Sequence, residues 1–263
     1  MTLRTLFTLA LAGAALLRPA ETAAEPVAVR HVERTLHGFL SLRAPDGRLL
    51  ADGDLLQTVS GGRVTARLVF HFKDGSTSDE TAVFSQQGHF RLISDRLVQE
   101  GPAFERTLEM TIDAPGGQVT VRYKNEHGEE KVEAERMDLP ADLANGLITT
   151  LLKNVRPTAL PSSLSMVVAT PKPRLVKLAI AAAGTNSLSI AGSPRKAVHF
   201  VLKVDIGGFA GLVAPLVGKQ PPDSHVWILQ GDVPAFLRSQ SPMFVGAPLW
   251  QIDLVSPVWP RPR

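Results

Sequence analysis

The stretch DLPADLANGLITTLLKNV, residues 138–155, decides the fold that we predict for this chain. Asp138 is a suitable N-cap, Pro140 fits the first turn, and Pro157 would end the helix. We therefore expect one amphipathic helix over 138–155 in a chain whose other segments are typical of strands. Its apolar stripe follows helical spacing and comprises Leu143, Ala144, Leu147, Ile148, Leu151, Leu152 and Val155.

Turn signals recur along the chain on the N-terminal side of this helix. Apolar and polar residues alternate between them, so that Leu68, Phe70 and Phe72 share one face opposite Arg67 and His71. This pattern predicts an antiparallel meander of long strands with one dry and one wet face. The turns are marked by Asp46-Gly47, Gly61-Gly62, Asp74-Gly75, Gln87-Gly88, Gly101-Pro102, Gly116-Gly117 and His127-Gly128.

The number of these strands determines the expected architecture. A sheet of many long strands with one small cover curls, either into a closed barrel or into an open one around something apolar. We therefore predict a mainly β fold, a long-stranded antiparallel meander curled into an open, incomplete β-barrel around the central helix. Residues 25–263 form a single β-rich domain in this prediction, with the curved sheet and helix over 25–206 and a closing segment over 207–263.

The N-terminus has the pattern of a signal peptide. Arg4 is the positive residue, residues 5–17 are apolar, and Thr22, Ala23 and Ala24 provide small residues before a cleavage site. A signal peptide over 1–24 predicts a bacterial protein that is periplasmic or secreted. An uncleaved anchor is the alternative, although the apolar run is shorter than the roughly 20 residues that a spanning helix needs.

Composition excludes several classes of function. Cysteine is absent from the sequence, which excludes disulfides, thiol catalysis and cysteine-ligated metals. The net charge is +3, and loss of Arg4, Arg18 and Glu21 with the signal peptide would leave it near +2. A nucleic-acid-binding protein normally shows a concentrated basic face, so we expect no nucleic-acid partner.

No motif in the sequence names a reaction. The seven histidines show neither the i,i+4 helical nor the i,i+2 strand spacing of a metal site, so no metal or other cofactor is expected. A metal site assembled across strands stays open as an alternative. The acidic pairs Asp79-Glu80 and Glu129-Glu130 lie beside turns and are interpreted as exposed. An enzyme is our third hypothesis, and it requires a cleft where ionisable groups with perturbed pKa values converge.

Residues 207–218, GGFAGLVAPLVG, are apolar and uncharged. One interpretation is a buried segment that closes the end of the barrel. The other is a mobile lid, or a membrane-touching loop, at the mouth of a cavity.

The aromatic residues suggest a site as well as a core. Eleven Phe and three Trp against one Tyr supply apolar rings with little hydrogen-bonding capacity. Packing explains most such rings, but inner-face residues could also line a cavity for a lipid or another apolar ligand. The candidate ligand-binding residues are Phe70, Phe72, Phe90, Leu108, Met110, Leu147, Leu151, Phe200 and Leu202.

The order of these features resembles a known family. A leader, a meander with Asp-Gly and Gly-Gly turns, the helix at 138–155 and further strands resemble, over about 27–206, the incomplete β-barrel superfamily of bacterial lipoprotein carriers. The resemblance implies a bent sheet around helices with a cavity that holds acyl chains. Our first hypothesis is therefore a periplasmic, non-enzymatic binding or carrier protein for an apolar small molecule or lipid. The alternative is a structural or interaction module of the cell envelope, with an envelope protein as its partner and a barrel filled by its own helix.

Overall fold

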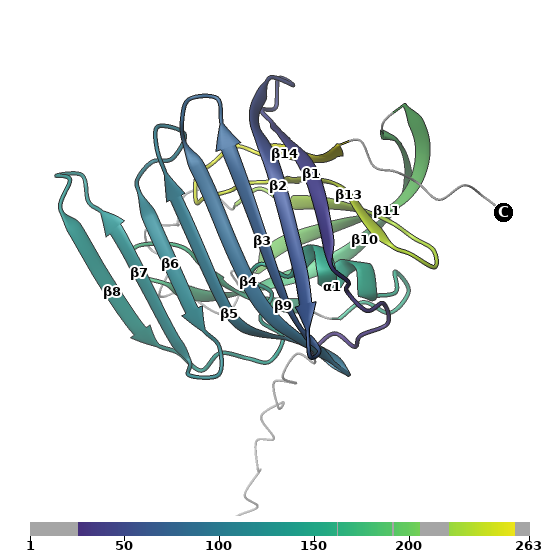
Figure 1. The fold of residues 1–263 in the computed structure, drawn as a ribbon, viewed down its shortest axis with the longest axis horizontal. Helices are drawn as coiled ribbons and strands as arrows, with labels where there is room; N and C mark the ends of the chain where they lie inside the picture. Colours follow the sequence, from purple (N-terminus) through teal and green to yellow (C-terminus); the bar gives the residue numbers. More distant parts are fainter. Residues whose placement is uncertain (1–25, 162, 191, 206–220, 256–263) are drawn as a thin grey trace, which may run out of the picture.

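The computed structural model describes residues 26–161, 163–190, 192–205 and 221–255, which Figure 1 draws in colour. These residues form one 14-stranded sheet in the order β8-β7-β6-β5-β4-β3-β2-β1-β14-β13-β12-β11-β10-β9. The strands are β1 (Leu36–Arg43), β2 (Leu49–Ser60), β3 (Arg63–Phe72), β4 (Thr77–Gln87), β5 (His89–Glu100), β6 (Leu108–Asp113), β7 (Gln118–Lys124), β8 (Glu130–Arg136), β9 (Ser163–Val168), β10 (Arg174–Ile190), β11 (Ser193–Asp205), β12 (Ser224–Leu229), β13 (Ala235–Ser241) and β14 (Trp250–Val255).

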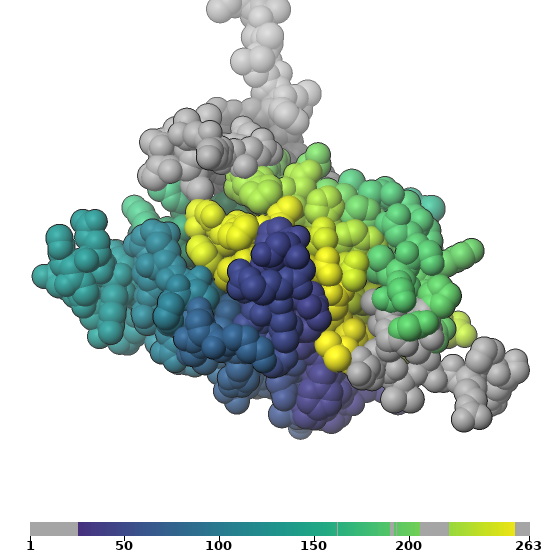
Figure 2. Space-filling model, turned by 90° about the horizontal axis from the view of Figure 1, so that it is seen from above, coloured from purple at the N-terminus to yellow at the C-terminus, as the bar shows by residue number. Residues whose placement is uncertain are grey.

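The sheet confirms the predicted mainly β, antiparallel meander. Strands β2 to β8 follow in chain order on one side of β1, and β14 lies on its other side. The β1–β14 register runs from Phe39 opposite Val255 to Arg43 opposite Gln251. Figure 2 shows this contact between the two ends of the described chain: purple N-terminal residues lie against yellow C-terminal residues. Within the described residues β8 and β9 remain as edges, so the structure is one open sheet rather than the open, incomplete β-barrel around a central helix that we predicted.

One hydrophobic core joins both halves of this sheet. Phe84 of β4, Phe90 of β5, Phe200 of β11 and Ile228 of β12 belong to the same buried cluster. In Figure 1 the green and yellow strands β10 to β14 cross behind the purple and blue strands β1 to β4. Burial of one large apolar side chain contributes about 1.5–3 kcal/mol, so the shared core stabilises the packing of one half against the other.

The helix is shorter than predicted. The helix α1 spans Ile148–Asn154, and its N-cap is Leu147, which makes no side-chain capping hydrogen bond. The prediction of a helix from Asp138 is therefore wrong over its first half. Gly146 explains the difference, because its φ of +64° is a left-handed conformation that interrupts a right-handed helix.

The segment before α1 pairs with a strand instead of coiling. Leu143 forms an isolated bridge with Ser165 of β9, and the Ala144 N–H donates to the Ser165 carbonyl at 2.8 Å. The Asn145 side chain reproduces a strand neighbour: its Nδ2 donates to the Val167 carbonyl at 2.8 Å, and its Oδ1 accepts from the Val167 N–H at 2.9 Å. These bonds satisfy buried backbone groups that a continuous helix would leave without partners.

A buried ion pair ties α1 to the N-terminal segment and the sheet. Lys153 Nζ lies 2.6 Å from Glu33 Oε1, and both side chains are largely shielded from solvent. Gln57 of β2 donates to the other Glu33 oxygen at 3.0 Å, and the Glu33 N–H donates to the Gln86 side chain of β4 at 2.7 Å. Lys153 is therefore fixed by a network that includes two strands.

Several predictions fall on residues that the structure does not describe. The signal peptide over 1–24 and the whole apolar stretch over 207–218 lie outside the described residues, as do residues 256–263. Among the described residues, no helix has the length and the run of apolar residues that crossing a membrane requires.

Candidate functional site

The nine candidate ligand-binding residues are all buried, but they do not lie together. Phe70 and Phe72 pack with Trp250 in one cluster, and the other seven belong to the larger core around α1. Phe70, Phe90, Met110, Leu147 and Phe200 are no more than 2% exposed, which shows that the protein's own side chains occupy the space around them.

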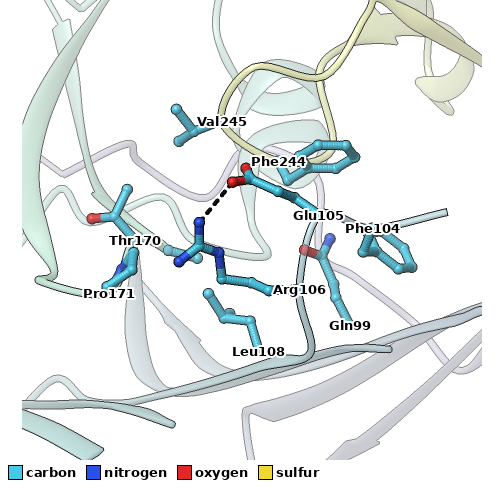
Figure 3. A pocket seen from close by; sticks show the side chains of 10 residues that line it. Gln99, Phe104, Glu105, Arg106, Leu108, Thr170, Pro171, Phe244 and Val245 are labelled. Atoms are coloured by element: carbon cyan, nitrogen blue, oxygen red, sulfur yellow. Dashed lines mark hydrogen bonds and ion pairs between the residues drawn. The ribbon is translucent and has the colours of Figure 1, made fainter. Parts of the chain in front are cut away.

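A small pocket lies where three loops meet (Figure 3). It is formed by the β5–β6, β9–β10 and β13–β14 loops and has a volume of about 150 Å³. Leu108 is the member of the predicted set that lines it. The other lining residues are Gln99, Phe104, Glu105, Arg106, Ala169, Thr170, Pro171, Phe244 and Val245. We call this space the loop pocket.

Aromatic rings form one wall of the loop pocket. The Phe104 and Phe244 rings meet edge to face, with centroids 5.8 Å apart. Phe104 also contacts Phe72 at 5.3 Å, and Phe244 contacts Trp250 at 5.9 Å. Such edge-to-face pairs add about 0.5–1.5 kcal/mol each beyond area burial, so the wall is held by the core behind it.

Polar contacts fix the loops around this wall. The buried Gln99 side chain donates from Nε2 to the Met243 carbonyl at 2.9 Å, which joins β5 to the β13–β14 loop. The Ala103 N–H donates to Ser76 Oγ at 2.8 Å, which joins the β5–β6 loop to the turn before β4. At the rim, Arg106 and Glu105 form an ion pair at 2.6 Å, visible as the dashed line in Figure 3.

A pair of carboxyl groups on the inner face of the sheet forms a second candidate site. Asp95 of β5 lies opposite Ala82, and Glu80 of β4 lies opposite Leu97, so the two acids are diagonal neighbours on one face. Asp95 is 0% exposed, and neither of its oxygens has a hydrogen-bond partner within the described structure. We call Glu80 and Asp95 the acid pair.

Burial perturbs the pKa values of the acid pair. Loss of solvent raises the pKa of Asp95 well above its usual value, and the nearby Glu80 charge adds to this effect. Loss of solvent also raises the pKa of Glu80 to about 7, although part of the side chain stays accessible. An enzyme site requires ionisable groups with perturbed pKa values inside a cleft. The acid pair has the perturbed pKa values, but neither Glu80 nor Asp95 lines the loop pocket.

A third cluster lies on the opposite, outer face of β11 and β12. His199 lies across from Trp227 in the strand register, and the two rings stack with centroids 4.4 Å apart. His199 Nε2 and His225 Nδ1 are 2.9 Å apart, within hydrogen-bond distance. Trp227 Nε1 donates to Asn186 Oδ1 at 3.0 Å. We call His199, His225 and Trp227 the histidine cluster.

These clusters were not predicted from the sequence. Glu80 was expected to be exposed, whereas the alternation of Glu80, Ala82 and Phe84 places it on the inner face. The two histidines are distant in sequence, and the register that joins them is fixed only by the pairing of β11 with β12.

Comparison with known proteins identifies no relative. No family model, no curated protein and no solved structure matches this chain. Among the residues that the structure describes, no group of three or more His, Asp or Glu side chains could hold a metal ion.

Proposed function

We propose that this protein is a periplasmic, non-enzymatic binding or carrier protein for an apolar ligand, and that the loop pocket receives the apolar end of that ligand. The observation that carries the proposal is the ring wall of Phe104 and Phe244 beside the charged rim of Arg106 and Glu105. Apolar walls with a few polar groups at the edge are typical of small-molecule sites. In this proposal the loop pocket has the role that the enclosed cavity has in the lipoprotein carriers.

The size of the loop pocket defines the ligand more closely. A cavity of about 150 Å³ has room for a group as large as benzene, and sites for whole drug-sized ligands span roughly 300–1,000 Å³. The loop pocket therefore fits one ring or the end of a chain, with the remainder of the ligand outside. An amphiphile whose polar part lies beside Arg106 matches this arrangement.

Native mass spectrometry of protein purified from its own periplasm without detergent tests the proposal. We expect a retained amphiphile, and we expect octanoate or octanol to raise the melting temperature by about 2–4 °C for each kcal/mol that the bound ligand adds to the free energy of unfolding. Phe244→Ala should abolish that rise. Phe39→Ala is the control, because Phe39 is 55% exposed on the outer face. No retained ligand and no thermal shift in the unmodified protein would refute the proposal.

The packed interior favours a second candidate, an interaction module of the cell envelope. Phe39, Leu56 and Val255 are exposed apolar residues on adjoining strands, and the register places them on one outer face. Exposed apolar surface of this kind marks contact sites when it is contiguous. Crosslinking in cells from position 56 should then recover a specific envelope protein, and Leu56→Glu should remove it.

A further inference from the structure

We propose that His199 and His225 form a binding site for a divalent transition-metal ion such as Cu²⁺ or Ni²⁺ on the outer face of β11 and β12. This inference does not rest on the proposed ligand-binding function, because the loop pocket lies among different loops. Imidazole nitrogen suits copper, nickel and zinc ions.

The spacing of the two nitrogens matches adjacent positions around one ion. Metal–imidazole bonds of about 2.05 Å place two nitrogens about 2.9 Å apart at a right angle and about 3.3 Å apart at the tetrahedral angle. His199 Nε2 and His225 Nδ1 are 2.9 Å apart. Both rings must turn away from their shared hydrogen bond so that the two lone pairs converge on one ion, and the right angle at tetragonal Cu²⁺ or Ni²⁺ preserves this nitrogen spacing.

The protonation state of the pair also permits metal binding. In the hydrogen bond, one of the two nitrogens carries the proton and the other accepts it. An ion binds through a lone pair on each nitrogen, so the proton of the donating ring moves through the solvent to the other nitrogen of the same ring. Two metal–nitrogen bonds then replace two bonds between the ion and water.

Neighbouring groups orient the pair and neutralise positive charges that would repel a metal ion. Trp227 stacks on His199 and is itself held by Asn186. Two cations on neighbouring positions of the described strands are paired: Lys203 lies 3.2 Å from Asp223, and Arg238 lies 2.6 Å from Asp253. Both histidines are half-buried, so the remaining coordination positions are accessible to water or to an external ligand.

Calorimetric titration of the tag-free, chelator-treated full chain with CuCl₂ tests the site. We expect one ion per chain and two nitrogen ligands in the electron paramagnetic resonance spectrum. His199→Gln and His225→Gln should each weaken binding by at least roughly tenfold. His71→Gln on β3 is the control and should leave binding unchanged.

Two results would overturn the site. One is a dissociation constant weaker than about 1 mM for the unmodified chain. The other is equal binding by His199→Gln, His225→Gln and the unmodified chain, which would place the ion elsewhere. Circular dichroism of each variant separates a lost ligand from a lost fold, and Ni²⁺ in place of Cu²⁺ gives a second measurement.

Discussion

The acid pair puts two carboxyl groups where an antiparallel sheet normally buries apolar side chains. Asp95 lies under the segment that leads into α1, and Gly146 is the residue that approaches it. A Cβ atom at Gly146 would lie 2.5 Å from the Ala82 Cβ and 3.1 Å from Asp95 Oδ1. A buried carboxylate without a partner is costly, so the pair favours its protonated form.

Gly146→Ala should therefore destabilise the protein strongly. Both the left-handed φ and the contact with Ala82 oppose a side chain, and we expect a loss above about 2 kcal/mol in urea unfolding. Gly128→Ala is the matched control, because Gly128 has φ +76° but nothing within 4 Å of its added Cβ. Its cost should stay near 1 kcal/mol. Equal losses would show that crowding at Gly146 has no role.

The stability of the protein should fall as pH rises through about 7. The pKa of Glu80 is raised from 4.5 to about 7 by burial, so between these values the folded protein binds more protons than the unfolded chain. The stabilisation from this group is full below 4.5 and is lost above about 7. Allowing for its partial exposure, the difference is about 1–3 kcal/mol.

Glu80→Gln isolates this effect. The melting temperature of the variant should exceed that of the unmodified protein at pH 8.5, and the difference should shrink towards pH 5. Glu100→Gln, at an exposed position on β5, is the control and should reproduce the original profile. A pH profile that Glu80→Gln leaves unchanged would contradict the assignment.

At the scale of elements, α1 shows what the sequence can and cannot predict. The apolar stripe correctly marked Leu147, Leu151 and Leu152 as buried. Helical periodicity does not reveal that Asn145 completes the hydrogen bonds of Val167, because that contact depends on the position of β9. The alternation of buried and exposed side chains in β3 could be predicted, because successive side chains of a strand point to opposite faces of the sheet.

The ion pair between Lys153 of α1 and Glu33 should contribute much more to the free energy of unfolding than an exposed ion pair does. Glu33→Ala leaves Lys153 buried without its partner and should cost about 3–5 kcal/mol in urea unfolding. Asp52→Ala removes an exposed pair with Lys73 of the same 2.6 Å length and should cost about 0–1 kcal/mol. Similar losses in the two variants would show that burial does not set the difference.

In the complete sheet, the pairing of strands that are distant in the chain could not be predicted from the sequence. The hairpins could be predicted from turn residues, since each turn joins strands that are neighbours in the chain. The contact of β1 with β14 has no local signal. The loop pocket has none either, because its walls come from residues as distant as Gln99 and Val245. The candidate ligand residues were correctly assigned to the interior, but the packing that fills their surroundings is a tertiary property.

Ile252→Pro should disrupt the whole fold. Ile252 of β14 pairs with Leu42 on one side and Ser239 on the other, so a proline there interrupts the strand between the two halves of the sheet. We expect loss of cooperative unfolding by circular dichroism. Val132→Pro in the edge strand β8, which has one neighbour, should keep a cooperative transition. A cooperative Ile252→Pro variant would contradict this view of β14.

The β1–β14 pairing also has a consequence for biosynthesis. Ser41 is synthesised early and meets its partner Asp253 only after β2 to β13 have been made. At roughly 5–20 residues per second, the edge of β1 then waits about 10–40 s with open backbone hydrogen-bonding groups. Chains that stop before residue 250 never cover that edge and are open to pairing with one another. Synthesis of β14, rather than formation of any hairpin, is therefore the step that covers the open edge of β1.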